Sequence, residues 1–425
     1  MKKIVKLSMA MGFIGLSAAS LPLFAQPPAP LKTARLLSEA REPVRIVCFG
    51  DSITGIYYHS GGRRAWPEML KVALNRLYPQ ADVTVINAGV SGHSSGQGLG
   101  RIEKDVLARK PHLVVVMFGM NDLAYGAVAP EKEAAIKTTF AGRLKAIVEK
   151  CRAAGAEVIL CTQNPVYPEA LPHRPPERIG EFAGLIRQTG AELKVPVADI
   201  YTEWETLRKT DVRSWRLLMS ETVHPSMAGH KRMAERVAGT ISGRTVSLAG
   251  VTAEQPVCET VIARLKDGAP VVLAATEALA PLVAAAVSNR FPKASFTVTP
   301  LPVKANTPAA FANGCRGVRS LAPALVFLSP PPELLAFDNE EAFVRQISWA
   351  VNWSLPFAGS AWTAVGVDPA LACLDLTRQQ LEGSERVREI VRGHDLDWIG
   401  QPPGASIKLQ DALDQWFVRQ TGKGQ

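Results

Sequence analysis

The chain has 425 residues, of which 47% are hydrophobic and 20% are charged. This balance is that of a globular protein with enough apolar material for two cores, and it excludes extensive disorder. The net charge of +9 is dispersed, and lysines and arginines adjoin one another at most in pairs. Nucleic-acid binding is therefore not expected.

The first 25 residues have the features of a secretory signal peptide, because three lysines precede a mostly apolar run that ends in small residues. A membrane anchor is the alternative, but the apolar part is short and prolines follow it directly. We therefore expect cleavage after Ala25, export to a periplasm or to the cell exterior, and no stable membrane insertion. Residues 26–42 are expected to form a Pro-rich linker.

Residues 43–250 alternate between short β-rich runs and longer helical patterns. Continuous apolar strands separated by helices indicate a parallel sheet covered on both faces, and therefore a three-layer α/β/α domain. The predicted strands are 44–49, 83–87, 113–118, 158–162 and 195–200, and the predicted helices are 66–78, 130–154, 177–193 and 227–241.

Residues 251–425 repeat this rhythm and are predicted to form a second α/β domain. The predicted strands are 271–275, 296–301, 325–329, 362–367 and 396–399. The sequence PALVFL at 323–328 echoes PHLVVV at 111–116. A degenerate duplication is one explanation, and the rhythm common to all α/β domains is the other. No catalytic motif follows these strands, so we expect a non-catalytic scaffold, a cap over the cleft or an interaction surface.

Four short motifs in the first domain contain the residue types of a hydrolytic site. Three of them follow predicted strands, whose carboxyl ends meet at one edge of a parallel sheet. Each motif alone can be a plain turn, so their significance lies in the combination. They read GDSIT at 50–54, NAGVSG at 87–92, GMND at 119–122 and ETVHP at 221–225.

These four motifs, in this order, resemble those of the SGNH/GDSL hydrolase family, and the resemblance runs from about residue 43 to residue 243. It implies a flavodoxin-like three-layer fold in which Ser52 attacks an ester carbonyl and His224 moves the proton. It also implies an oxyanion hole formed by the backbone N–H groups of Ser52 and Gly89 and by the side chain of Asn121. This division of roles is chemically sound, because a serine hydroxyl needs a nearby base and the developing negative charge needs fixed donors.

One position departs from the family pattern. The family has Asp three residues before the catalytic His, whereas this chain has Glu221. A glutamate keeps the charge and can still orient the imidazole, so we expect Glu221 to be the third catalytic residue. A Ser/His dyad assisted by a backbone carbonyl is the alternative.

The residues just beyond the nucleophile, Tyr57, Tyr58 and His59, are expected to line the substrate pocket because of their proximity to it. The histidines of the chain have no partners at ligand-like spacing, so no metal site is expected. No organic cofactor is expected either.

Together these features predict an exported serine esterase that forms an acyl-enzyme on Ser52. The resemblance to the family further implies that it removes acetyl groups from a carbohydrate. The partner is then a small-molecule or polysaccharide ester. The alternatives within the family are a lipase, lysophospholipase or thioesterase, and a glycan O-acetyltransferase. A catalytically silent binding protein is the alternative from another class. The sequence does not specify the acyl group, the alcohol or the oligomeric state.

Overall fold

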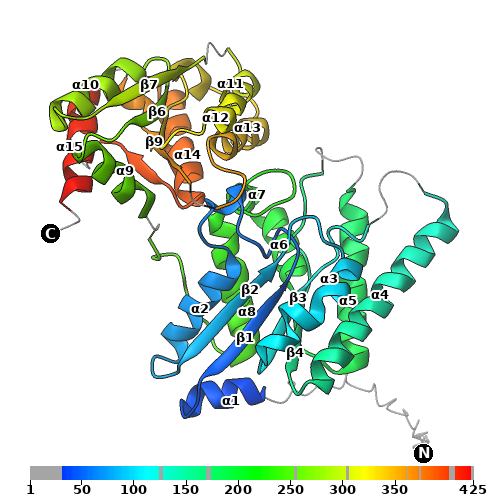
Figure 1. Cartoon of the computed structure of the whole chain (residues 1–425). Helices are drawn as coiled ribbons and strands as arrows, with labels where there is room; N and C mark the ends of the chain where they lie inside the picture. The colour runs from blue at the N-terminus through cyan, green and yellow to red at the C-terminus, as the bar shows by residue number, and fades with distance from the viewer. Residues whose placement is uncertain are drawn as a thin grey trace, which may run out of the picture.

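The computed structural model describes residues 31–123, 128–168, 174–252, 256–302, 306–359, 361–372, 375–401 and 407–422. The predicted signal peptide lies outside these ranges. The chain forms two parallel five-stranded sheets, each flanked by helices (Figure 1). Within the described part of the chain, no helix has the length and apolar character needed to cross a membrane.

The first sheet has the strand order β2-β1-β3-β4-β5, and all of its neighbouring strands are parallel. The central strands are buried along nearly their whole length, as expected for a sheet covered on both faces. Its strands are β1 Val44–Gly50, β2 Val83–Gly89, β3 Leu113–Met117, β4 Glu157–Cys161 and β5 Val197–Ala198. Its helices are α1 Lys32–Glu39, α2 Trp66–Leu77, α3 Ser95–Asp105, α4 Pro130–Ala153, α5 Pro176–Leu193, α6 Ile200–Thr210, α7 Val212–Leu217 and α8 Met227–Ser242.

The second sheet has the order β7-β6-β8-β9-β10, so its strands follow one another in space as those of the first sheet do. The predicted α/β class, with a parallel sheet in each half of the chain, is confirmed. The strands are β6 Val271–Thr276, β7 Phe296–Leu301, β8 Leu325–Leu328, β9 Thr363–Val367 and β10 Asp397–Ile399. The helices are α9 Pro256–Lys266, α10 Ala280–Arg290, α11 Pro308–Gly314, α12 Val318–Leu321, α13 Glu340–Trp353, α14 Arg378–Gly393 and α15 Leu409–Thr421.

The core of the second half shows why its strands read as continuous apolar runs. Successive side chains of a strand point to opposite faces of the sheet. Leu273 and Phe327 accordingly join a cluster with helices α9, α10 and α15. Their neighbours Ala274 and Val326 join a separate cluster with α11, α13 and α14. The sheet is therefore covered by helices on both faces, which makes a second three-layer unit.

The identical strand order agrees with a duplication, but it is also the common flavodoxin-like order. The two segments with similar sequence are the third strands, β3 and β8, of their sheets. The duplication and the boundary at residue 250 stay predictions. We use the predicted ranges 43–250 and 251–425 as the first and second domains below.

The expected linker 26–42 differs from the structure in its described part. Residues Lys32–Glu39 form helix α1, which packs on the first domain. The backbone N–H and the hydroxyl of Thr33 both donate to Glu157, each over 2.7 Å, and Leu37 is buried. This part of the segment is therefore folded, because a distant carboxylate binds the unpaired amides at the start of a short helix.

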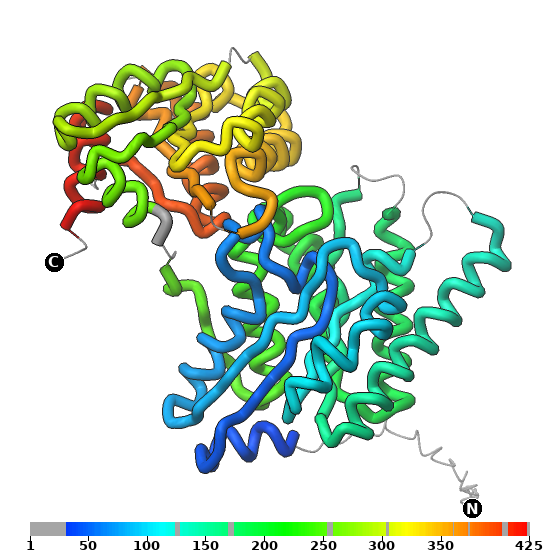
Figure 2. The backbone as a smooth tube through the Cα atoms, viewed as in Figure 1, coloured from blue at the N-terminus to red at the C-terminus, as the bar shows by residue number. Residues whose placement is uncertain are grey.

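The second domain lies at the end of the first sheet where β1 finishes (Figures 1 and 2). A buried ion pair joins the two domains, with Arg64 Nε 2.8 Å from Asp395 Oδ2. Near the nucleophile, Tyr58 N donates to Phe357 O over 3.1 Å. The second domain thus contacts the edge of the sheet at which the predicted catalytic motifs meet.

Candidate active site

Ser52 lies in a tight turn that follows β1. The backbone carbonyl of Asp51 accepts hydrogen bonds from Thr54 N at 3.1 Å and Gly55 N at 3.0 Å, and its side chain accepts from Ile53 N at 2.9 Å. Burial raises the pKa of Asp51 to about 7, although the hydrogen bond from Ile53 and the charge of His224 oppose this shift. The turn therefore holds the Ser52 side chain at the carboxyl end of the sheet.

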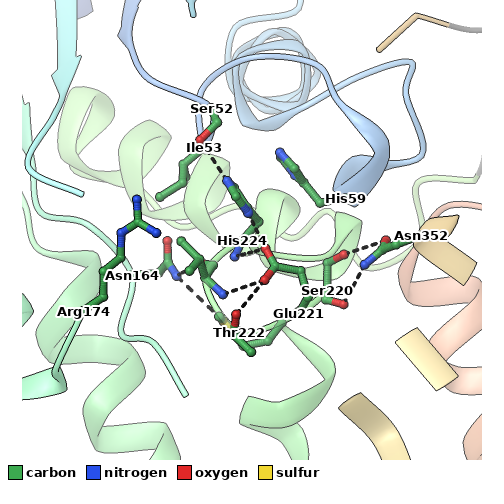
Figure 3. Close-up of polar contacts among 12 residues, drawn as sticks. Ser52, Ile53, His59, Asn164, Arg174, Ser220, Glu221, Thr222, His224 and Asn352 are labelled. Carbon is green, nitrogen blue, oxygen red and sulfur yellow. Dashed lines mark hydrogen bonds and ion pairs between the residues drawn. The ribbon is translucent and has the colours of Figure 1, made fainter. Parts of the chain in front are cut away.

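Ser52, His224 and Glu221 form a continuous hydrogen-bonded line (Figure 3). Ser52 Oγ lies 2.8 Å from His224 Nε2, and His224 Nδ1 contacts Glu221 Oε1. An ionised carboxylate accepts only, so the proton of a neutral His224 lies on Nδ1. His224 Nε2 then has a free lone pair for the serine proton, which is the arrangement that a general base requires.

Glu221 is buried and its carboxylate is fully bonded. Oε1 also accepts from His224 N at 2.9 Å, while Oε2 accepts from Thr222 Oγ1 at 2.9 Å and Val223 N at 3.0 Å. Burial alone would raise the pKa of Glu221, but the charge and hydrogen bonds of His224 and the bond from Thr222 lower it below its usual value. The extra methylene of glutamate thus does not prevent contact with the imidazole.

The loop that contains Glu221 and His224 lies between α7 and α8 and is closed on itself. Ser220 N donates to His224 O over 2.9 Å, and a single antiparallel bridge joins Met219 to Pro225. The buried Asn164 side chain donates to Val223 O over 2.9 Å. These bonds fix the distance between the carboxylate and the imidazole.

Asn121 lies at the same pocket, in the loop after β3. Its Oδ1 accepts from Arg174 Nη2 at 3.0 Å, and its Nδ2 donates to His93 O over 3.2 Å. Arg174 also donates from Nε to Met120 O over 3.2 Å. An amide nitrogen has two hydrogens, so Asn121 keeps one for a ligand while Arg174 fixes the orientation of the amide. No sequence signal pointed to Arg174.

The structure does not support the expected role of Gly89. Its amide N–H already donates to Asn87 Oδ1 over 3.0 Å, and its Cα faces the backbone of Thr54 and Gly55 so closely that a Cβ would clash. Gly92, in the same motif, lines the pocket with a φ of 75° and open space beside it. The side chain two residues before Gly89 forms an Asx turn, which is the sequence signal that could have separated these glycines.

Behind His224 lies a stack of two further histidines. The His59 ring is parallel to that of His224, with centroids 4.5 Å apart, and His230 follows at 5.5 Å. Trp66 N donates to His230 Nδ1 over 3.1 Å, so His230 Nε2 carries the proton and faces His59 Nδ1 at 3.3 Å. Burial lowers the pKa of both rings, to about 3 for His230. Two neutral rings therefore support the imidazole of His224.

The pocket in front of Ser52 has a volume of about 170 Å³. Tyr57, Tyr58 and His59 line it, as expected from their proximity, although His59 is almost fully buried. Phe357 of the second domain also lines it. No sequence signal pointed to Phe357, because it lies 305 positions after Ser52 along the chain.

The second domain also contacts the residue next to Glu221. Asn352 Nδ2 donates to Ser220 O over 3.0 Å, and Asn352 Oδ1 accepts from Ser220 Oγ at 2.9 Å (Figure 3). His394 Nε2 lies 3.1 Å from the same hydroxyl, and burial lowers the pKa of His394 to about 4. All three side chains are buried, so the end of the catalytic loop is bonded to helix α13 and to the residue that follows helix α14.

Comparisons with known proteins match the part of the chain that contains this site. Residues 48–232 match the GDSL-like Lipase/Acylhydrolase family. An acetylxylan esterase of Geobacillus stearothermophilus is 27% identical over 164 residues, which are 38% of this chain and 73% of the relative. Esterase TesA of Pseudomonas aeruginosa is 26% identical over 211 residues, 48% of this chain and 92% of the relative. A crystal structure of a lipase/acylhydrolase from Enterococcus faecalis has 29% identity and a TM-score of 0.40, and covers 48% of this chain and 97% of that one.

The matched residues contain the motifs of Ser52, Asn121 and His224, and the predicted resemblance is confirmed. Residues 48–232 are a domain of the GDSL-like lipase/acylhydrolase family, and the protein is a carboxylic ester hydrolase of this type.

Proposed function

We propose that Ser52 is the nucleophile, His224 the general base and acid, and Glu221 the carboxylate that orients His224. The observation that supports this most strongly is the continuous line of bonds from Ser52 Oγ to Glu221 Oε1, with 2.8 Å between the serine oxygen and His224 Nε2. An isolated serine and histidine would not need a buried, fully bonded carboxylate behind them.

In the first step Ser52 Oγ bonds to the ester carbonyl carbon while its proton moves to His224 Nε2. The bond to the alcohol oxygen then breaks, and the alcohol leaves with that proton. A water molecule gives a proton to His224, attacks the acyl-enzyme and releases the acid, after which Ser52 regains its proton. The buried carboxylate of Glu221 stabilises the imidazolium that forms in both halves of the reaction.

The negative charge on the carbonyl oxygen needs donors that are fixed in advance. We propose the N–H groups of Ser52 and Gly92 and the remaining hydrogen of Asn121 Nδ2 for this oxyanion hole. Gly92 and Asn121 line the pocket together with Ser52, and Arg174 holds the amide of Asn121. Loss of one such donor typically costs about 3 to 4 kcal/mol of transition-state stabilisation.

The substrate that we propose is a short-chain ester, and specifically an acetylated carbohydrate. The cavity of about 170 Å³ is smaller than the usual range of pockets for larger ligands, which begins at about 300 Å³. It therefore favours a small acyl group. The similarity to an acetylxylan esterase supports the same choice. The features of residues 1–25 support export, which would bring the enzyme to extracellular polysaccharides.

A hydrolase of longer acyl esters, such as a lipase, is the second candidate, since the matched family is named for lipases as well as acylhydrolases. The two candidates differ in the volume of the pocket that must hold the acyl chain.

Hydrolysis of para-nitrophenyl acetate and octanoate by the mature protein tests the proposal. We expect higher kcat/KM on acetate, and loss of turnover in Ser52→Ala. Preference for octanoate would favour the second candidate. Turnover that Ser52→Ala leaves unchanged would overturn the proposed nucleophile.

A further inference from the structure

The second domain contributes an exposed aromatic ring to the active site. Phe357 lines the same pocket as Ser52 and His224. Its exposed fraction is 53%, whereas the other exposed large hydrophobic residues in the described ranges are aliphatic. Those aliphatic residues are Val212, Val272, Leu381 and Val418. A ring that is left half in water beside a nucleophile calls for an explanation other than packing of the core.

The backbone at Phe357 is held firmly against the first domain. Tyr58 N donates to Phe357 O over 3.1 Å, and Tyr57 forms an antiparallel bridge with Ala358. Gly62 has a φ of 75°, and a Cβ on it would lie 2.5 Å from Gly359 O. The close approach of these two loops, visible in Figure 2 where the orange and blue segments touch, therefore fixes the place of the exposed ring.

Tyr57 and Tyr58 both contact the Phe357 ring. Their ring centroids lie 5.6 and 5.8 Å from that of Phe357, at tilted angles. The guanidinium of Arg319 lies over both Tyr58, at 4.9 Å, and Phe357, at 5.9 Å. These contacts immobilise the edge of an aromatic platform and leave part of the Phe357 ring free to bind a ligand.

The position of the platform relative to His224 indicates which part of the ester it would contact. His224 delivers a proton to the alcohol oxygen, so the alcohol must leave beside the imidazole. Tyr58 lies next to this imidazole, with ring centroids 6.3 Å apart, and Phe357 lies next to Tyr58. Phe357 is thus separated from the imidazole by the single ring of Tyr58, and we assign it to the side of the alcohol.

The chemistry of the platform fits a sugar ring. A pyranose presents an apolar face of C–H groups and a rim of hydroxyls, and an exposed aromatic ring binds such a face while the hydroxyls stay in water. A long alkyl group would instead require an enclosed apolar channel, which a cavity of about 170 Å³ does not provide.

We propose that Phe357 is a specificity-determining residue that stacks on the sugar ring of the alcohol part of the ester, so that the second domain selects the substrate of the first. This inference rests on the proposed esterase activity of Ser52.

The test compares two acetate esters with different alcohols. One is an acetylated methyl xyloside, which has a pyranose ring, and the other is ethyl acetate, which has none. For Phe357→Ala we expect about 10-fold lower kcat/KM on the xyloside acetate, mainly through KM, and less than a 2-fold change on ethyl acetate. Phe357→Trp should retain the activity of the wild type on the xyloside acetate. Leu381→Ala is the matched control, since it removes an equally exposed apolar side chain of the second domain.

Equal losses on both esters, or no loss on either, would overturn the role of Phe357. If the wild type hydrolyses ethyl acetate but not the xyloside acetate, the proposal that the alcohol is a sugar would be overturned, while the esterase activity would stand. Absence of Ser52-dependent turnover of both esters would instead overturn the proposed function. Thermal unfolding of each variant shows whether a general loss comes from misfolding, and Phe357→Trp then provides the decisive comparison.

Discussion

The two sheets of this protein have the same strand order but differ at their carboxyl edges. In the first, β1 runs into Gly50, Asp51 and Ser52, whereas β6, at the corresponding place, runs into Thr276 and Glu277. The third strand of the first sheet leads to Asn121, while that of the second leads to a series of prolines. Both folds place loops at the carboxyl edge of a parallel sheet, but only the loops of the first sheet contain the residues proposed to react.

The second domain nevertheless contacts the site in the first. Asn352 and His394 bind Ser220, the neighbour of Glu221, and Phe357 lines the pocket. The two domains therefore differ in their contributions to the site. The first domain contains the proposed reacting groups, whereas the second binds the loop of Glu221 and lines part of the pocket. Variants at corresponding positions in the two domains test this difference.

The largest effect is expected at the first strands of the two sheets. Ser52→Ala should lower kcat on para-nitrophenyl acetate by at least about 10³-fold, because the variant lacks the hydroxyl that is proposed to form the acyl-enzyme. Thr276→Ala, at the end of β6, should leave kcat within a factor of 2. Steady-state kinetics of both variants measure this contrast, and a similar loss in both would show that the second sheet takes part in the chemistry.

Glu221 provides the next largest effect. Glu221→Gln should lower kcat by about 10²- to 10⁴-fold, because an amide neither stabilises the imidazolium nor fixes the tautomer of His224. Glu221→Asp should retain more activity, because it keeps the charge. The ratio of kcat values separates the triad from a Ser/His dyad, for which Glu221→Gln would cost less than about 5-fold.

Asn352 tests the contribution of the second domain to the position of the carboxylate. Asn352→Leu removes both bonds to Ser220 and should lower kcat by about 10-fold with little change in KM, because Glu221 is no longer held in place. The control is Glu340→Gln, which weakens the ion pair with Arg216 between the same domains, at 3.1 Å. An equal fall in kcat in both variants would show that Asn352 only holds the two domains together and does not position Glu221.

His394 is expected to make stability depend on pH. Burial lowers its pKa in the folded protein to about 4, below the usual 6.5, so the unfolded chain binds the proton more readily between these values. The contribution is present above pH 6.5 and is lost as the pH falls toward 4, by up to about 3 kcal/mol. Chemical unfolding at pH 7.5 and 4.5 should show a smaller acid loss for His394→Gln than for the wild type. An equal loss in both proteins would contradict this account.

The sequence predicted most of the fold because strong apolar runs defined the strands. All ten predicted strands correspond to strands of the structure. The last one of the first sheet is shorter than expected, because Asp199 caps helix α6 by accepting from Thr202 N at 3.2 Å. Helix α1 was missed because its eight residues follow prolines, and its docking depends on Glu157, far along the chain.

The site was predicted where local motifs define it. The four motifs bring Ser52, Asn121, Glu221 and His224 to one place, as expected from the edge of a parallel sheet. The structure does not support the choice of Gly89 over Gly92, because Gly89 N donates its hydrogen bond to Asn87 Oδ1. Asn352 and Phe357 lie at the site because one domain packs on the other. Neither hydrophobic periodicity nor a sequence motif predicts such a contact.

The most direct test of the account is covalent labelling of the full-length mature protein with diethyl para-nitrophenyl phosphate, followed by peptide mapping. We expect one diethylphosphoryl group per chain, attached to Ser52, slower labelling in Glu221→Gln, and none in Ser52→Ala. Labelling at a residue other than Ser52, or rapid labelling that Ser52→Ala does not prevent, would contradict it.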